Sequence, residues 1–179
     1  MNILLDGKEI NFTHDDFPML ISGADKTGTS FFSICLLANI ANEGQKVLLF
    51  SAYPAAKEEF RKHINNEQNA LIIESGDELE FIERIKNIDD LAERVILIKN
   101  IEAYSYRLLE AIEGAGFLIF SGDLDKCKFA DNLLNMKWAT KIFFSPSLKY
   151  TEDDLTDLPK YCGRIFSQKH QGIINLDIL

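Results

Sequence analysis

The sequence predicts an α/β fold in which a mainly parallel sheet is covered by helices on both faces. Short, continuously apolar runs alternate with longer segments whose apolar residues recur at helical spacing. Continuously apolar strands are typical of parallel sheets that are buried on both faces. The chain has 179 residues, no repeat and no obvious linker. We therefore expect a single domain over residues 1–179.

The expected strands are apolar runs bounded by polar or turn residues. The chain opens with a hairpin over residues 2–12, because Asp6 and Gly7 form a strong two-residue turn signal. The last two strands, 164–167 and 173–178, are expected to form a terminal antiparallel pair. The strands expected between these two pairs are residues 18–22, 46–51, 70–74, 94–99, 117–121 and 141–145.

Helices are expected between these strands, where apolar residues follow a helical period. In the first, Phe32, Leu36 and Ile40 fall on one face, and Gly44 follows its end. The expected helices are residues 29–42, 55–65, 77–92, 103–113 and 125–136.

The composition excludes several classes of function. The net charge is −9 and no Lys/Arg-rich run occurs, so we expect no nucleic-acid partner, since neutralising phosphates needs a basic face. The cysteines Cys35, Cys127 and Cys162 are scattered and no histidine lies near them in sequence, which favours reduced thiols and no metal site. No apolar run can cross a bilayer and no signal peptide pattern opens the chain, so we expect this domain in the cytoplasm.

Residues 21–30, ISGADKTGTS, join an expected strand to an expected helix. They have the frame of a phosphate-binding P-loop, G-x-x-x-x-G-K-[ST], with its glycines at Gly23 and Gly28 and its hydroxyl at Ser30. The backbone N–H groups of such a loop form an anion site at a helix N-terminus. Thr29 stands where the frame has its lysine. The candidate nucleotide-binding residues are Gly23, Ala24, Asp25, Lys26, Thr27, Gly28, Thr29 and Ser30.

Two interpretations of Lys26, three residues before the lysine position, stay open. Its side chain reaches back to a phosphate, or it is a solvated charge at the tip of the loop. The neighbouring Asp25 opposes anion binding through like-charge repulsion.

The second ATPase motif, Walker B, is an apolar strand that ends in an aspartate for Mg²⁺, usually followed by an acid that orients water. The best candidate is residues 95–100, VILIKN, where Lys99 replaces the aspartate and Asn100 the catalytic acid. Phosphoryl transfer relies almost wholly on such charges, so we predict no catalytic residue and no hydrolysis above background. Alternatively, Lys99 approaches the phosphates from the opposite side and replaces the missing charge. Asp123 comes two residues late for the pattern and is interpreted as a capping or loop aspartate.

The order of these parts resembles the FtsK/SpoIIIE-type, RecA-like P-loop ATPase domain. In that family a segment P-h-L-h-h-G-A-T-G-S-G-K-S opens the core, with h for an apolar residue, and residues 18–30 are similar to it. This chain departs from it at Asp25, Lys26 and Thr29. The family residues that it keeps are Pro18, Leu20, Gly23, Ala24, Gly28 and Ser30. Its tail, residues 157–166 (DLPKYCGRIF), resembles that of the tandem ATPase modules of type VII secretion coupling proteins, EssC or EccC.

The resemblance implies a degenerate, non-hydrolysing module, most plausibly the C-terminal one of a larger secretion motor that is tethered to the cell membrane elsewhere. Its expected partners are the other ATPase modules of the same chain and small helical WXG-type secreted proteins, which bind helix-in-groove. No direct membrane contact is expected, and either no cofactor or weakly bound ATP and Mg²⁺.

Two alternatives are kept. The first is a nucleotide-binding ATPase with a rearranged P-loop, in which Lys26 or Lys99 supplies the missing charge. The second is a fragment of a DNA translocase, which fold analogy alone suggests and the acidic charge opposes.

Overall fold

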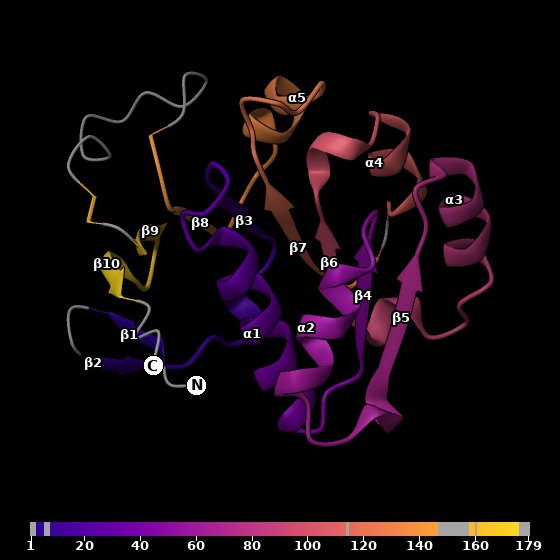
Figure 1. Cartoon of the computed structure of the whole chain (residues 1–179), viewed down its shortest axis with the longest axis horizontal. Helices are drawn as coiled ribbons and strands as arrows, with labels where there is room; N and C mark the ends of the chain where they lie inside the picture. The colour runs from indigo at the N-terminus through magenta and orange to yellow at the C-terminus, as the bar shows by residue number, and fades with distance from the viewer. Residues whose placement is uncertain (1–2, 6–7, 114, 147–157, 160, 176–179) are drawn as a thin grey trace.

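The computed structural model of the chain describes residues 3–5, 8–113, 115–146, 158–159 and 161–175. Their strands form one sheet in the order β2-β1-β10-β9-β8-β3-β7-β6-β4-β5 (Figure 1). The six strands from β8 to β5 are mutually parallel. The parallel strands are β3 (Met19–Ser22), β4 (Val47–Ser51), β5 (Ala70–Glu74), β6 (Val95–Lys99), β7 (Phe117–Gly122) and β8 (Thr140–Phe143).

The remaining strands extend the sheet in antiparallel fashion beyond β8. They are β1 (Ile3–Leu5), β2 (Lys8–Ile10), β9 (Cys162–Ser167) and β10 (Gln171–Asn175). The expected terminal pair is confirmed as β9 and β10, and β10 also pairs with β1. Residues 176–178 of the expected last strand lie outside the described residues. The opening hairpin is confirmed in its strands, with Leu5 opposite Lys8. Its turn residues, Asp6 and Gly7, lie outside the described residues, as do Asp157 and Lys160 of the tail.

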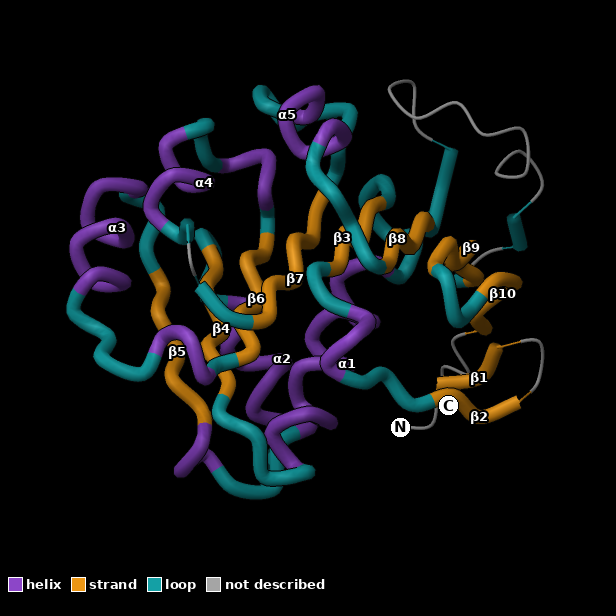
Figure 2. The backbone as a smooth tube through the Cα atoms, turned by 180° about the vertical axis from the view of Figure 1, so that it is seen from behind, coloured by secondary structure: helices purple, strands orange, loops and turns teal. Residues whose placement is uncertain are grey.

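Helices cover both faces of the parallel sheet. α1 (Thr29–Asn42) and α2 (Ala55–His63) pack on one face, in front of the sheet in Figure 1. The other face is covered by α3 (Glu78–Lys86), α4 (Arg107–Ala111) and α5 (Ala130–Asn135), as the view from behind shows (Figure 2). The predicted α/β class is therefore confirmed.

The two faces divide the side chains of each parallel strand, since successive residues of a strand point to opposite sides. Along β6, Val95 and Leu97 pack on the α1 side, whereas Ile96 and Ile98 pack on the α3–α5 side. Lys99 follows Val95 and Leu97 at the same spacing of two residues and therefore lies on the α1 side of the sheet. Its side chain therefore points from the carboxyl end of β6 toward α1.

Four helices are shorter than expected. The helix predicted over 55–65 ends at His63. In the other three, polar side chains near the ends bond to the backbone in turns. The helix predicted over 77–92 ends at Lys86, where the Asn87 side chain bonds to the Glu83 carbonyl. The helix predicted over 103–113 begins at Arg107, after a separate 3-10 turn. The helix predicted over 125–136 begins at Ala130, because Asp123 organises a turn ahead of it.

The described residues contain further features that bear on function. The side chains of Cys35, Cys127 and Cys162 are buried. Within the described ranges, no group of three His, Cys, Asp or Glu residues is placed to hold a metal ion. None of the helices described combines the length and apolar content that crossing a membrane requires.

Gly116 is required by a close backbone approach at the start of β7. A Cβ at this position would lie 2.2 Å from the carbonyl oxygen of Ala92 and 3.2 Å from that of Arg94. Backbone atoms cannot move away without shifting the strand. We expect Gly116→Ala to lower the free energy of unfolding by about 1–3 kcal/mol in urea denaturation. Gly76→Ala is the matched control, since nothing lies within 4 Å of its Cβ position; equal effects of the two substitutions would contradict this account.

Candidate functional site

The glycine loop lies at the carboxyl edge of the parallel sheet, between β3 and α1. As the sequence predicts, β3 enters the loop directly and α1 begins at Thr29. Gly28 caps the helix with a φ of 109°, a left-handed conformation that favours glycine. The N–H groups of Gly28, Thr29 and Ser30 have no acceptor within the described part of the chain. They are available to an anion at the positive end of the helix.

Threonine side chains brace the loop where a P-loop would carry its lysine. The Thr27 hydroxyl donates a hydrogen bond to the Ala24 carbonyl over 2.7 Å and lies 3.1 Å from the Thr29 hydroxyl. Thr29 itself is buried. The Ala24 N–H donates to Ser145 Oγ over 2.9 Å, which fixes the loop to the end of β8. Thr29 therefore contributes to loop shape and supplies no charge.

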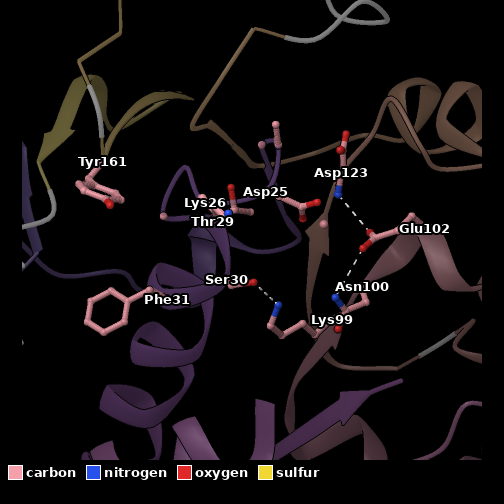
Figure 3. A pocket seen from close by; sticks show the side chains of 14 residues that line it. Asp25, Lys26, Thr29, Ser30, Phe31, Lys99, Asn100, Glu102, Asp123 and Tyr161 are labelled. Carbon is pink, nitrogen blue, oxygen red and sulfur yellow. Dashed lines mark hydrogen bonds between the residues drawn. The ribbon is translucent and has the colours of Figure 1, made fainter. Parts of the chain in front are cut away.

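Lys99 brings a charge to the loop from the opposite strand. In the sheet it lies opposite Ser121 of β7, next to the register position that pairs Gly122 with Ser22 at the start of the loop. Its Nζ donates a hydrogen bond to Ser30 Oγ over 2.5 Å (Figure 3). The side chain thus reaches the N-terminus of α1. The alternation of β6 explains this direction.

The Lys99 ammonium is buried and lacks a close counterion. The residue is 5% exposed, and it forms no ion pair within 4.0 Å among the described residues. Burial lowers the pKa of Lys99, while the charges of Glu102 and Asp25 act in the opposite direction. Burying an ammonium without an ion pair costs folding free energy, and such groups are typical of functional sites.

Glu102 is a site residue that sequence reasoning missed. It lies in the 3-10 turn after β6, and its Oε2 accepts a hydrogen bond from the Asp123 N–H over 3.1 Å. Its Oε1 lies 3.5 Å from the Asn100 amide nitrogen, and the Asn100 Oδ1 accepts from Ser51. No motif spacing points to Glu102. The signal available was its place just after the carboxyl end of a parallel strand, the edge where such sheets bind ligands.

A bridge joins the loop tip to the end of β7. The Lys126 Nζ lies 3.0 Å from Asp25 Oδ2 and 3.1 Å from Asp123 Oδ2, and these contacts raise the pKa of Lys126. Asp123 also accepts a hydrogen bond from the Asp125 N–H, which confirms it as a loop aspartate. The bridge offsets the repulsion that Asp25 was expected to exert on an anion.

Lys26, the other candidate cation, lies at the tip of the loop with an exposed side chain. Its φ is 65°. It faces the same cavity as Lys99 but from the rim, as Figure 3 shows. Of the two lysines considered from the sequence, Lys99 is the one that the fold holds in contact with the hydroxyl of Ser30.

These residues enclose one cavity of about 450 Å³. This volume is in the usual range of small-molecule sites. Tyr161 and Phe31 lie on one side of the loop, and Glu102 and Asp123 on the other (Figure 3). Every predicted loop residue except Thr27 lines the cavity, together with both degenerate Walker B residues, Lys99 and Asn100.

The sequence matches no protein-family model and no curated protein. The structure is similar to solved structures of other proteins. The genome packaging NTPase B204 from Sulfolobus turreted icosahedral virus 2, in complex with AMPPCP, has a TM-score of 0.61 and 14% identity, over 93% of this chain and 100% of that one. Its complex with AMP has a TM-score of 0.62 and 13% identity, over 90% of this chain and 97% of that one.

At such low identity the likeness shows the fold alone. Together with the strand, glycine loop and helix at the carboxyl edge of the sheet, it confirms the predicted RecA-like P-loop NTPase fold.

Proposed function

We propose that this chain is a degenerate P-loop domain that does not hydrolyse ATP and acts as a recognition or regulatory module of a larger ATPase assembly. The observation that carries the proposal is the Lys99 ammonium at 2.5 Å from Ser30 Oγ, where the motif calls for an aspartate and Mg²⁺. Lys99 stands where an acidic Mg²⁺ ligand is needed, and the loop has Thr29 in place of its lysine.

The loss of hydrolysis follows from the charges. Phosphoryl transfer needs positioned cations on the transferred group and an acid that orients the attacking water. Asn100 has no carboxylate, and Glu102, the acid nearest in sequence, accepts hydrogen bonds from the Asp123 N–H and lies near the Asn100 amide. An Mg²⁺ ion at Ser30 would lie beside the buried Lys99 ammonium and be repelled by it.

The assembly that we propose is a type VII secretion motor. The support is the resemblance of residues 18–30 to the FtsK/SpoIIIE-type segment, apart from Asp25, Lys26 and Thr29, and that of the tail to the modules of those coupling proteins. The partners would be the other ATPase modules of the same protein and small helical WXG-type substrates, with the domain in the cytoplasm and the motor at the membrane. The likeness to a genome packaging NTPase suggests a DNA motor instead. We favour a protein partner, because a net charge of −9 disfavours binding to phosphate backbones.

Phosphate release from ATP by the purified chain, with Mg²⁺ in excess, tests the loss of hydrolysis. We expect release at the level of a protein-free blank, because no charge set stabilises the transition state. Ser30→Ala is the control for contaminating ATPases, since it removes the loop hydroxyl. A rate above the blank that Ser30→Ala abolishes would show that the site hydrolyses ATP and would overturn the proposal.

A further inference from the structure

We infer that the cavity binds the phosphate groups of a nucleotide without a divalent cation, with the Lys99 ammonium standing in the place of the metal ion. The inference rests on the proposed function, a degenerate P-loop domain that does not hydrolyse ATP. It adds a ligand class and a mode of binding that differs from the usual metal-dependent one.

The first argument is the position of the ammonium. In a P-loop the hydroxyl at the Ser30 position binds Mg²⁺. Here Ser30 Oγ accepts a hydrogen bond from Lys99 Nζ over 2.5 Å, so the oxygen that would bind the metal already has a cation. The lysine comes from the strand that usually supplies the metal's acidic partner. Lysine in place of aspartate at position 99 thus removes an acidic ligand of the metal ion and at the same time supplies a positive charge near the place of that ion.

The second argument is the unused binding capacity of the ammonium. An ammonium has three N–H donors, and one of them bonds to Ser30. Among the described residues the other two have no acceptor. With 5% exposure, solvent gives little compensation. Phosphate oxygens in the cavity would accept from these donors and compensate the buried charge.

The third argument is the rest of the cavity. The N–H groups of Gly28, Thr29 and Ser30 lack acceptors within the described chain and lie at the N-terminus of the 14-residue helix α1, so they favour an anion at the same place. Lys26 adds positive charge at the rim.

The acids of the cavity oppose this binding only in part. Asp25 and Asp123 are both paired with Lys126. Glu102 accepts the Asp123 N–H and stays on the side of the cavity away from Tyr161 (Figure 3). An anion at the helix N-terminus therefore lies beside Lys99 and the free N–H groups rather than beside an unpaired carboxylate of the loop.

The test is isothermal titration calorimetry of the purified chain with millimolar ATP, first in EDTA and then with excess Mg²⁺. We expect saturable binding in EDTA, and Mg²⁺ to weaken it several-fold, since the metal neutralises the phosphates and finds its protein ligand occupied. Tripolyphosphate and adenosine are titrated in parallel. Binding of tripolyphosphate but not adenosine shows recognition of the phosphate chain, whereas adenosine binding alone would overturn the inference.

Substitutions assign the binding to Lys99. Lys99→Met is expected to weaken ATP binding in EDTA at least tenfold, whereas Lys86→Met, at the exposed end of α3 on the other face of the sheet, leaves it unchanged. Thermal unfolding checks that both variants fold. A loss of binding in Lys26→Ala but not in Lys99→Met would overturn the inference, because it would assign the charge to the loop.

The outcomes separate this inference from the proposed function. Flat titrations with ATP and tripolyphosphate in EDTA would overturn metal-free binding and leave a non-hydrolysing scaffold standing. ATP binding that occurs only with Mg²⁺ would likewise overturn metal-free binding and leave the non-hydrolysing scaffold standing. Phosphate release that depends on Ser30 would overturn the proposed function itself, whatever the titrations in EDTA show.

Discussion

Lys99→Met is expected to stabilise the domain while abolishing its ligand binding. The side chain is buried and its ammonium has no ion pair among the described residues, so folding removes the charge from water with only the hydrogen bond to Ser30 and the more distant charges of Glu102 and Asp25 in return. Methionine has a similar length and keeps the packing against α1. We expect the free energy of unfolding at neutral pH to rise by about 1–3 kcal/mol in urea denaturation.

The control for this prediction is Lys86→Met, which replaces an exposed lysine at the end of α3. Its effect should stay within about 0.5 kcal/mol, as for most surface substitutions. A residue whose removal stabilises the fold but destroys binding is kept for function. A destabilised Lys99→Met would contradict this account, because it would show that the ammonium contributes to folding.

The pH dependence provides a further check on the same variant. Burial lowers the pKa of Lys99 below its ordinary value of 10.5, with Glu102 and Asp25 acting against that shift. The cost of the buried charge is therefore fully present well below the folded-state pKa, and it disappears as the pH rises toward 10.5. The stability difference between Lys99→Met and the unmodified chain should narrow between neutral and alkaline pH. A constant difference would show that it arises from packing.

A lysine at position 29 and an aspartate at position 99, as in the usual P-loop motifs, should make ATP binding depend on Mg²⁺. In the double variant Thr29→Lys with Lys99→Asp, the loop regains its lysine and the strand regains an acid directed at Ser30. We expect Mg²⁺ to strengthen ATP binding tenfold or more in calorimetry, about 1.4 kcal/mol in binding free energy. The reason is that Ser30 and Asp at position 99 can then share the metal.

The single variants are the controls for this reversal. Thr29→Lys alone places a second cation near Lys99 and loses the hydroxyl contact with Thr27, so it should destabilise the loop. Lys99→Asp alone removes the buried lysine from the cavity and leaves only Lys26 at the rim of the loop as a cation for the phosphates. If each single variant shows the same Mg²⁺ dependence as the double variant, the two positions act independently and the charge exchange is not the explanation.

The sequence identified the parts of the site that depend on local pattern. The apolar strands, the glycine loop and the start of α1 at Thr29 follow from periodicity and loop chemistry, and the structure confirms them. The direction of Lys99 also follows from alternation along β6, once that strand is known to continue the series of Val95 and Leu97. What the sequence left open was which lysine approaches Ser30, since this depends on how two strands and a helix are arranged.

Other parts of the site depend on contacts between distant segments. Glu102 enters the cavity through a 3-10 turn that no spacing rule describes, and Lys126 joins Asp25 across the loop and β7. The early end of α3 and the late start of α5 have a similar cause, because the side chains of Asn87 and Asp123 bond to nearby backbone groups. Helical periodicity continues through these positions, so it could not show where the helices end.

The most direct test of the account is the ATP affinity of the unmodified chain as free Mg²⁺ is raised from an EDTA-buffered solution to millimolar concentration. The account predicts measurable affinity without the metal and an affinity that falls several-fold as Mg²⁺ rises, because the Lys99 ammonium already bonds to Ser30 Oγ. The absence of binding in EDTA, followed by saturable binding once Mg²⁺ is present, would contradict it and would assign the metal its usual place.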